Sequence, residues 1–379
     1  MCSRRDFSTP LSHPFDVARR GWCAGILAFL SVSSVLSSSC VLPSAQAATL
    51  RARDIVVADE QAVFLVDPMT GDRTLISGNS TGSGPNFVSL QDVAVDEKGN
   101  IFVTNLNNLE TIGGSLMRVD AATGDRTLVT GGGVGSGPFP EFSSPRGIDL
   151  DQDGNILVTV KERAVVRVLP ETGERVAVSG LDFSEGEPFF DTALGIAISA
   201  QGDIFVMDDE GDGETLEDML FRVDPSTGKR TIVSDNSIGG EPRFDRLGVG
   251  IDLDDAGNVL VVSSNQVLAV DPTTGIRTLV SGGPVGSGPS FDSAFGLDYD
   301  PFSGRILIAD ASGSVLSVDP ATGDRVVLSG SGVGDGPNFV APHAVAVVPF
   351  LIAEPSSTIL ALCGLCGAVL LIYRLQVNE

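Results

Sequence analysis

Apolar and polar residues alternate along this chain in short runs, and the runs come in pairs. The apolar-rich runs at 63–66, 116–119 and 267–270 each stop at an Asp and are followed by Thr-Gly and a second run such as "RTLVSG". In "DPTTG" the Pro presets φ, the Asp accepts main-chain hydrogen bonds and the Gly supplies a left-handed conformation. Each pair of runs therefore predicts a β-hairpin.

The phrase Thr-Gly-x-Arg, or a near copy of it, recurs along the chain. Its glycines are Gly71, Gly124, Gly173, Gly228, Gly275 and Gly323, so the spacings are 53, 49, 55, 47 and 48 residues. A strand–turn–strand phrase such as "GIDLDQDGNILVTV" precedes each of the later five copies. Each unit therefore has four strands, and a strand-rich period near 50 residues is typical of β-propeller blades.

The first copy lacks a leading strand, and a matching strand follows the last copy. The body opens with three predicted strands from Asp54, whereas "PHAVAVVP" at 342–349 has no partner in its own unit. Pairing the two removes the exposed sheet edge. We therefore predict an all-β, six-bladed β-propeller of four-stranded blades over residues 48–350, with the ring closed by the C-terminal strand joining the N-terminal three.

One copy carries a family resemblance. The segment from Phe142 to Val158, "FSSPRGIDLDQDGNILV", resembles NHL repeats, and related phrases extend over most of residues 54–349. The resemblance implies a propeller that acts as a binding scaffold.

The two ends of the chain predict its cellular address. Arginines, an apolar run and small residues up to Ala47 are typical of a secretory signal peptide over residues 1–47, with an uncleaved membrane anchor as the alternative. Residues 351–379 contain Glu354, Pro355 and Ser356, an apolar stretch and Arg374. This tail resembles PEP-CTERM sorting signals, which implies membrane attachment and processing by an exosortase-like enzyme. An ordinary C-terminal anchor is the alternative, and both place the body outside the cell.

Charge and composition restrict the chemistry. The net charge is −25, which argues against a nucleic-acid partner and favours attraction of cations. All five cysteines lie near the ends, so the body has no thiolate site. His343 is the only histidine of the body, so a histidine-rich zinc site and a Ser–His–Asp set are not expected. We interpret His343 as structural or solvated.

Two sets of residues are expected near the propeller axis. The residues before the first strand of each unit are predicted to ring one mouth of the channel, and they are Gln91, Arg146, Leu194, Val249, Phe295 and His343. Further along, the innermost strands place three acids, Asp149, Asp252 and Asp298, beside three alanines, Ala94, Ala197 and Ala346. The acids either bind main-chain groups of neighbouring blades, which we favour, or hold a hard cation such as Ca²⁺.

A second acidic segment lies at 208–219, where seven of twelve residues are Asp or Glu. Asp208, Glu210 and Asp212 match the opening of a calcium-binding loop, although we favour a solvated acidic loop. The "DLDQDGNI" phrase at 149–156 also imitates such a loop, but it lacks the closing acid and is better explained as a hairpin.

Three functions remain open. The favoured one is a monomeric, envelope-anchored, non-catalytic module that binds a protein or an extracellular polysaccharide on one face. The second is a calcium-dependent lactonase or esterase, because the acids, together with Asn265, are similar to the channel site of gluconolactonase propellers. The third is a structural surface or matrix protein. Calcium is the one cofactor that these residues suggest.

Overall fold

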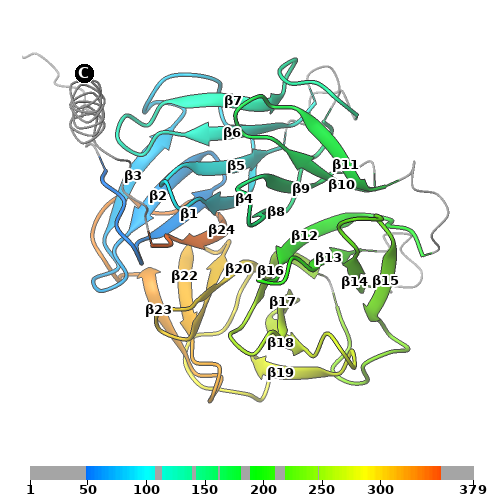
Figure 1. Cartoon of the computed structure of the whole chain (residues 1–379). Coiled ribbons are helices and arrows are strands. Elements are labelled where there is room, and N and C mark those ends of the chain that lie inside the picture. The colour runs from blue at the N-terminus through cyan, green and yellow to red at the C-terminus, as the bar shows by residue number, and fades with distance from the viewer. Residues whose placement is uncertain are drawn as a thin grey trace, which may run out of the picture. The chain divides into compact units, whose positions relative to one another are not determined.

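The computed structural model describes residues 48–106, 113–138, 142–160, 163–180, 188–209, 218–245 and 247–350. These residues form six antiparallel four-stranded sheets arranged around a central axis (Figure 1). The six-bladed propeller is therefore confirmed. In the described part of the chain, no helix is long and apolar enough to cross a membrane.

Each blade is a meander from the axis to the rim, and the strands fall into four classes by position. The innermost strands are β4 (Leu90–Val95), β8 (Ile148–Leu150), β12 (Ala193–Ile198), β16 (Leu247–Leu253), β20 (Ala294–Asp300) and β24 (Pro342–Val347). The second strands are β1 (Ile55–Asp59), β5 (Ile101–Asn105), β9 (Ile156–Val160), β13 (Ile204–Asp208), β17 (Val259–Ser263) and β21 (Arg305–Asp310). The third strands are β2 (Ala62–Val66), β6 (Ser115–Val119), β10 (Ala164–Val168), β14 (Met219–Val223), β18 (Gln266–Val270) and β22 (Ser314–Val318). The outermost strands are β3 (Arg73–Gly78), β7 (Arg126–Gly131), β11 (Arg175–Ser179), β15 (Arg230–Ser234), β19 (Arg277–Ser281) and β23 (Arg325–Gly330).

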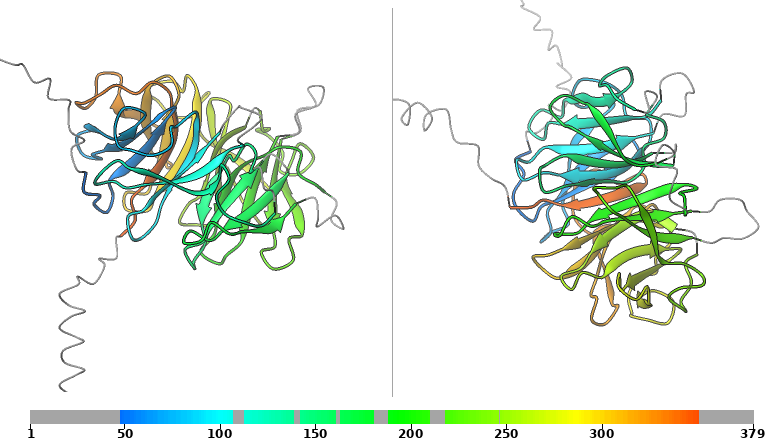
Figure 2. Two further views of the ribbon diagram at one scale, coloured as in Figure 1. Left: turned by 90° about the horizontal axis from the view of Figure 1, so that it is seen from above. Right: turned by 45° about the vertical axis from the view of Figure 1, so that its right-hand side comes forward.

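The C-terminal strand closes the ring. Strand β24 pairs antiparallel with β1, with Ile55 opposite Val347 and Val57 opposite Val345, and the sheet order is β24-β1-β2-β3. Figure 2 shows β24 beside β1 from two further directions, although almost the whole described chain separates the two strands in sequence. The predicted closure is therefore confirmed.

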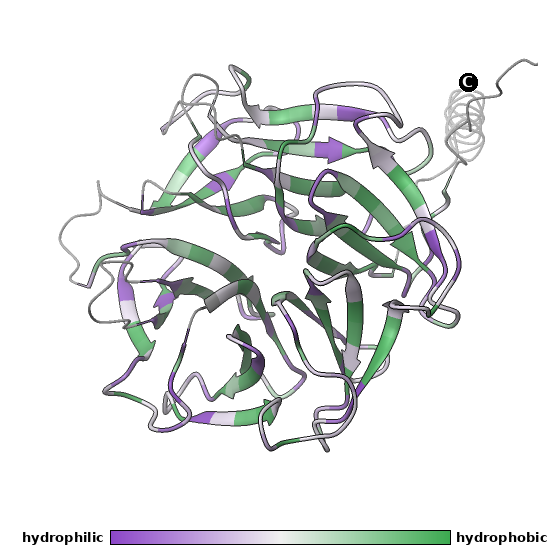
Figure 3. Cartoon of the chain, turned by 180° about the vertical axis from the view of Figure 1, so that it is seen from behind, coloured by the Kyte–Doolittle hydropathy of each residue, from purple (hydrophilic) through white to green (hydrophobic). Residues whose placement is uncertain are grey.

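The hydrophobic core lies between blades. One cluster joins Val56 and Val63 of the first blade to Val93, Val103 and Met117 of the second. Second strands such as β5 and β9 are buried along their whole length because other blades cover both faces. Hydrophobic colour accordingly follows the strands, and the hydrophilic residues gather in turns and along the rim (Figure 3).

The Thr-Gly turns have the predicted conformation. Asp67 Oδ1 accepts hydrogen bonds from the N–H groups of Met69 (2.8 Å) and Thr70 (3.2 Å), and Gly71 has φ of 75°. The left-handed φ is also found at the equivalent glycine of the other five blades. A side chain at Gly71 is excluded for a second reason, because its Cβ would lie 2.2 Å from the Leu328 carbonyl oxygen of the preceding blade.

The arginine that follows each turn joins two blades. All six are buried, and each donates hydrogen bonds to the loop of the preceding blade and lies over a phenylalanine of that loop; they are Arg73, Arg126, Arg175, Arg230, Arg277 and Arg325. Arg126, for example, donates to Pro85 O (2.6 Å), Gly78 O (2.8 Å) and Ser77 Oγ (2.9 Å), and its guanidinium lies 5.0 Å from the Phe87 ring centre.

This arrangement gives a structural role to the Gly-Ser-Gly-Pro segments at 82–85, 135–138 and 286–289, which connect one blade to the next. Carbonyl oxygens, a Ser or Thr hydroxyl and an aromatic face contact each buried guanidinium. We call this repeated contact the arginine clasp. The charged guanidinium donates the hydrogen bonds of the clasp and also makes a cation–π contact, and both interactions stabilise the blade interface.

Glycines on the innermost strands let the blades approach closely at the axis. A Cβ on Gly195 would lie 2.1 Å from the Val249 carbonyl oxygen of the next blade. We expect Gly195→Ala to lower the free energy of unfolding by about 1–3 kcal/mol, because main-chain atoms must move apart. Chemical denaturation measures this. The matched control is Gly78→Ala, where the nearest atom is 3.8 Å away and the change should be within about 0.5 kcal/mol. Equal effects of the two variants would contradict the steric argument.

Candidate functional site in the central channel

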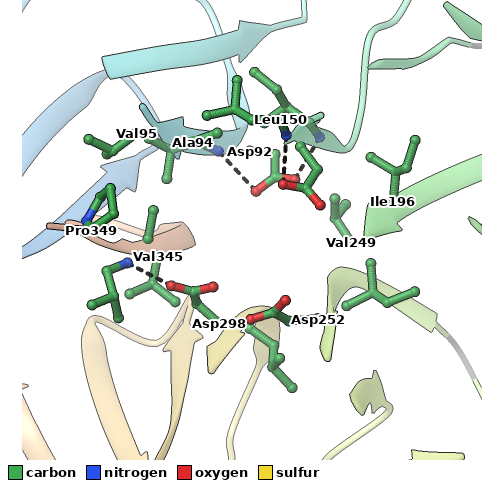
Figure 4. A pocket seen from close by; sticks show the side chains of 17 residues that line it. Asp92, Ala94, Val95, Leu150, Ile196, Val249, Asp252, Asp298, Val345 and Pro349 are labelled. Carbon is green, nitrogen blue, oxygen red and sulfur yellow. Dashed lines mark hydrogen bonds between the residues drawn. The ribbon is translucent and has the colours of Figure 1, made fainter. Parts of the chain in front are cut away.

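A cavity of about 190 Å³ lies along the propeller axis. Residues of the innermost strands line it, including Asp92, Asp149, Asp252 and Asp298 (Figure 4). Four carboxyl groups from four different blades thus share one small space, while aliphatic side chains such as Val345 form much of the remaining wall.

The three acids predicted from the sequence each bind the main chain of the following blade. Ile198 N–H donates to Asp149 Oδ2 (2.6 Å), Tyr299 N–H to Asp252 Oδ2 (2.8 Å) and Val347 N–H to Asp298 Oδ2 (2.6 Å). The geometry agrees with the interpretation of these acids as links between blades.

The fourth acid, Asp92, was missed. Its Oδ2 accepts a hydrogen bond from Ile148 N–H (2.9 Å) of the next blade, so it makes the same kind of link. The signal was present in the sequence: Asp92 stands where the other copies have Gly or Ala, and Ala94 stands where three copies have Asp. Residues two apart on a strand share a face, so the second blade keeps its carboxylate but moves it along the strand.

Asp252 and Asp298 form a pair of neighbouring carboxyl groups. They lie side by side in Figure 4. Two neighbouring carboxyl groups hydrogen-bond to each other only if one of them holds a proton. Burial, followed by the charge of Asp252, raises the pKa of Asp298 well above its usual range, and burial also raises the pKa of Asp252. Of the two acids, Asp298 has the more strongly raised pKa.

The other two channel acids also resist ionisation. Burial, reinforced by the negative charge of Asp252, raises the pKa of Asp149 to about 8. Burial raises the pKa of Asp92 to about 7, against the effect of its hydrogen bonds from Ile148 and Val93. The channel therefore binds more protons at neutral pH than four ordinary carboxylates would.

The residues predicted to ring a mouth of the channel lie on or just before the innermost strands of the six blades, which corrects one detail of the prediction. Five of the six lie within the innermost strands rather than before them, and only Arg146 precedes its strand. Arg146 donates to Gln91 Oε1 (2.9 Å), and the rings of Phe295 and His343 are 5.0 Å apart. The chemically mixed ring therefore contains two contacting pairs.

Of the second acidic candidate, Asp208 lies within the described residues. Asp208 is the buried last residue of β13, and its Oδ2 accepts a hydrogen bond from Asp191 N–H (2.8 Å). Asp59 and Asp310 end the second strands of other blades and bind main-chain N–H groups in the same way. Asp208 thus belongs to a repeated structural contact.

The remaining predicted residues either lie outside the described residues or do not line the cavity. Glu210 and Asp212 lie outside the described residues, as do the signal segment and the motif Glu354, Pro355 and Ser356. Asn265 lies in the turn between β17 and β18 and is not among the residues that line the cavity.

The described acids do not fit a calcium site in this arrangement. Within the described ranges, no group of three or more His, Cys, Asp or Glu side chains is placed to hold one metal ion. Calcium prefers six to eight oxygen ligands converging at 2.3–2.6 Å, whereas one oxygen of each channel acid already accepts a main-chain hydrogen bond.

The chain was compared with protein families, curated proteins and solved structures, and only solved structures are similar to it. No family model and no curated protein matches this sequence. Among solved structures, a gluconolactonase of Xanthomonas campestris is 13% identical, with 76% of this chain and 88% of that chain covered and a TM-score of 0.47. An auxiliary nutrient-binding protein of Bacteroides ovatus is 16% identical over 68% of this chain and 64% of that one, with a TM-score of 0.50. At 16% identity and a TM-score of 0.50, the likeness to the nutrient-binding protein shows a shared fold and nothing beyond it.

Proposed function

We propose that this protein is an exported, envelope-anchored, NHL-like propeller that binds a saccharide or protein partner on one face without catalysing a reaction. The observation that carries the proposal is the use of the channel carboxylates. In each of them, one carboxylate oxygen accepts a hydrogen bond from the main chain of the next blade, so that oxygen serves the structure of the ring. Together with the arginine clasps, these links make a rigid ring, and a rigid scaffold suits recognition by its rim and mouths.

Binding is tested by affinity electrophoresis of the full chain through gels that contain purified extracellular polysaccharides. A second arm captures protein partners on the immobilised chain. Retardation by at least one polysaccharide, or saturable capture of one protein, is the expected result. Migration unchanged in every gel, with no saturable capture, would favour a structural spacer instead.

The predicted address belongs to the same proposal. We expect the mature chain to begin at Ala48 and to be found in the cell envelope, with attachment through the segment after residue 350. N-terminal sequencing and cell fractionation measure both. A chain that retains residues 1–47 in the cytoplasmic fraction would contradict the proposed export.

A metal-dependent lactonase is the second candidate, because four carboxyl groups line one cavity. If the binding proposal is correct, adding calcium or a chelator should leave the melting temperature unchanged within about 1 °C, since a ligand that binds only the native state would raise it. A rise of several degrees that Asp149→Asn abolishes, with calcium-dependent hydrolysis of lactones, would favour the enzyme. The exposed Asp153→Asn is the matched control.

A further inference from the structure

Four of the six residues of the mouth ring are polar or aromatic, and they follow one another around the axis. Phe295 on β20, His343 on β24, Gln91 on β4 and Arg146 before β8 come from four consecutive blades. The Phe295 and His343 rings are 5.0 Å apart, His343 Nδ1 lies 2.7 Å from Leu90 O, and Arg146 bonds Gln91. We call these four residues the mouth arc. Leu194 and Val249 complete the ring on the apolar side.

Arg146 differs from the clasp arginines in its partners. Arg277 donates to five acceptors, namely Pro242 O, Ser234 Oγ, Asp235 O, Ile238 O and Gly240 O. Within the described structure, the only acceptor found for the Arg146 side chain is Gln91 Oε1, and no carboxylate lies within 4.0 Å of it.

The half-buried guanidinium of Arg146 therefore retains unused donors. A guanidinium presents five N–H donors in a planar fork that matches a carboxylate. In a protein of net charge −25, a partly desolvated cation without an acid beside it is the group that an anionic ligand would meet.

The rest of the arc limits the ligand further. The contact with Leu90 O requires the proton of neutral His343 on Nδ1, which leaves Nε2 as an acceptor for a hydroxyl group. The half-buried Phe295 ring beside it offers an apolar face for C–H groups. A carboxylate, a hydroxyl and an apolar face occur together in a sugar acid.

We propose that the mouth arc binds a uronic-acid unit of a saccharide, with its carboxylate on Arg146 and its hydroxyl and C–H groups toward His343 and Phe295. This inference rests on the proposed binding function and names its ligand class. The net charge of −25 disfavours a continuous polyanion, so the unit is an isolated or terminal one in an otherwise neutral saccharide.

Isothermal titration of the full chain with methyl glucuronide and with methyl glucoside tests this. We expect the glucuronide to bind and the glucoside to bind at least roughly 10-fold more weakly, because bonds to the guanidinium are charge-assisted. Arg146→Gln should weaken glucuronide binding by roughly 10- to 100-fold, with Arg146→Lys in between because it keeps the charge and loses the fork. The exposed Arg118→Gln should leave binding unchanged.

Melting temperatures of all variants establish that they are folded, and Arg146→Lys keeps the test open if Arg146→Gln does not fold. Equal affinity for the two glycosides, or glucuronide binding that survives Arg146→Gln, would overturn the inference. Failure to bind either glycoside while a polysaccharide still retards the chain would also overturn it, and would leave the proposed function standing. Failure of all binding assays would remove both.

Discussion

Replacing Arg73 by methionine is expected to lower the free energy of unfolding by about 3–5 kcal/mol. Arg73 lies on β3 in the first blade, but its guanidinium donates to Pro337 O (2.7 Å), Val333 O (2.8 Å) and Ser329 Oγ (3.0 Å) of the last blade and its loop. Methionine fills a similar volume without donors, so buried acceptors lose their partner. Urea denaturation of the full chain measures the effect.

The position of Arg73 makes this clasp different from the other five. It joins segments more than 250 residues apart, and it supplements the β24–β1 pairing that closes the ring. The matched control is Arg118→Met, an exposed arginine on β6, which should change the free energy of unfolding by less than about 0.5 kcal/mol. If the two variants were equally stable, the clasps would contribute little and the backbone pairing alone would hold the ring closed.

Replacing Asp298 by asparagine is expected to make the protein less sensitive to rising pH. The folded-state pKa values of the channel acids are raised, so the folded protein binds more protons than the unfolded chain between pH of about 4 and about 8. Their contribution to stability is therefore complete at low pH and is lost as the pH rises through that window. Each extra proton that the folded state holds makes the free energy of unfolding fall by about 1.4 kcal/mol for every pH unit of rise within the window.

Asparagine reproduces the protonated form of Asp298. Its Nδ2 can donate to Asp252, and its Oδ1 can accept from Val347 N–H, as the carboxyl oxygen does now at 2.6 Å. The free energy of unfolding is measured in urea at intervals from pH 5 to pH 8. Its fall with rising pH should be less steep in Asp298→Asn, by up to about 1.4 kcal/mol per pH unit. Asp153→Asn removes a charge from an exposed turn and should give a curve parallel to that of the unchanged chain. Parallel curves for all three proteins would mean that the pair holds no proton.

The repeat phrases predicted more than the number of blades. They placed the strands, the left-handed glycines and the closing strand, because hairpins depend on residues that are close in sequence. They also identified Asp149, Asp252 and Asp298 as residues of the channel wall, since the side chains of a strand alternate between its faces.

The contacts between blades were not evident in the same way. The arginine of Thr-Gly-x-Arg was seen only as part of a turn, yet it is buried in the loop of another repeat. Asp208 was grouped with an acidic loop, yet it ends a buried strand and binds Asp191 N–H. In both cases the partner lies outside the phrase, so local sequence does not specify it.

The sequence by itself determined the blades and the ring, because periodic turns and alternating side chains act over a few residues. Only the tertiary structure decided what the polar groups do. It showed that Asp92 joins the channel acids, that Asp252 and Asp298 lie side by side with raised pKa values, and that Arg146 keeps unused donors. These properties arise where strands from different repeats meet, and there burial and distance set the charge and the hydrogen bonding of each group.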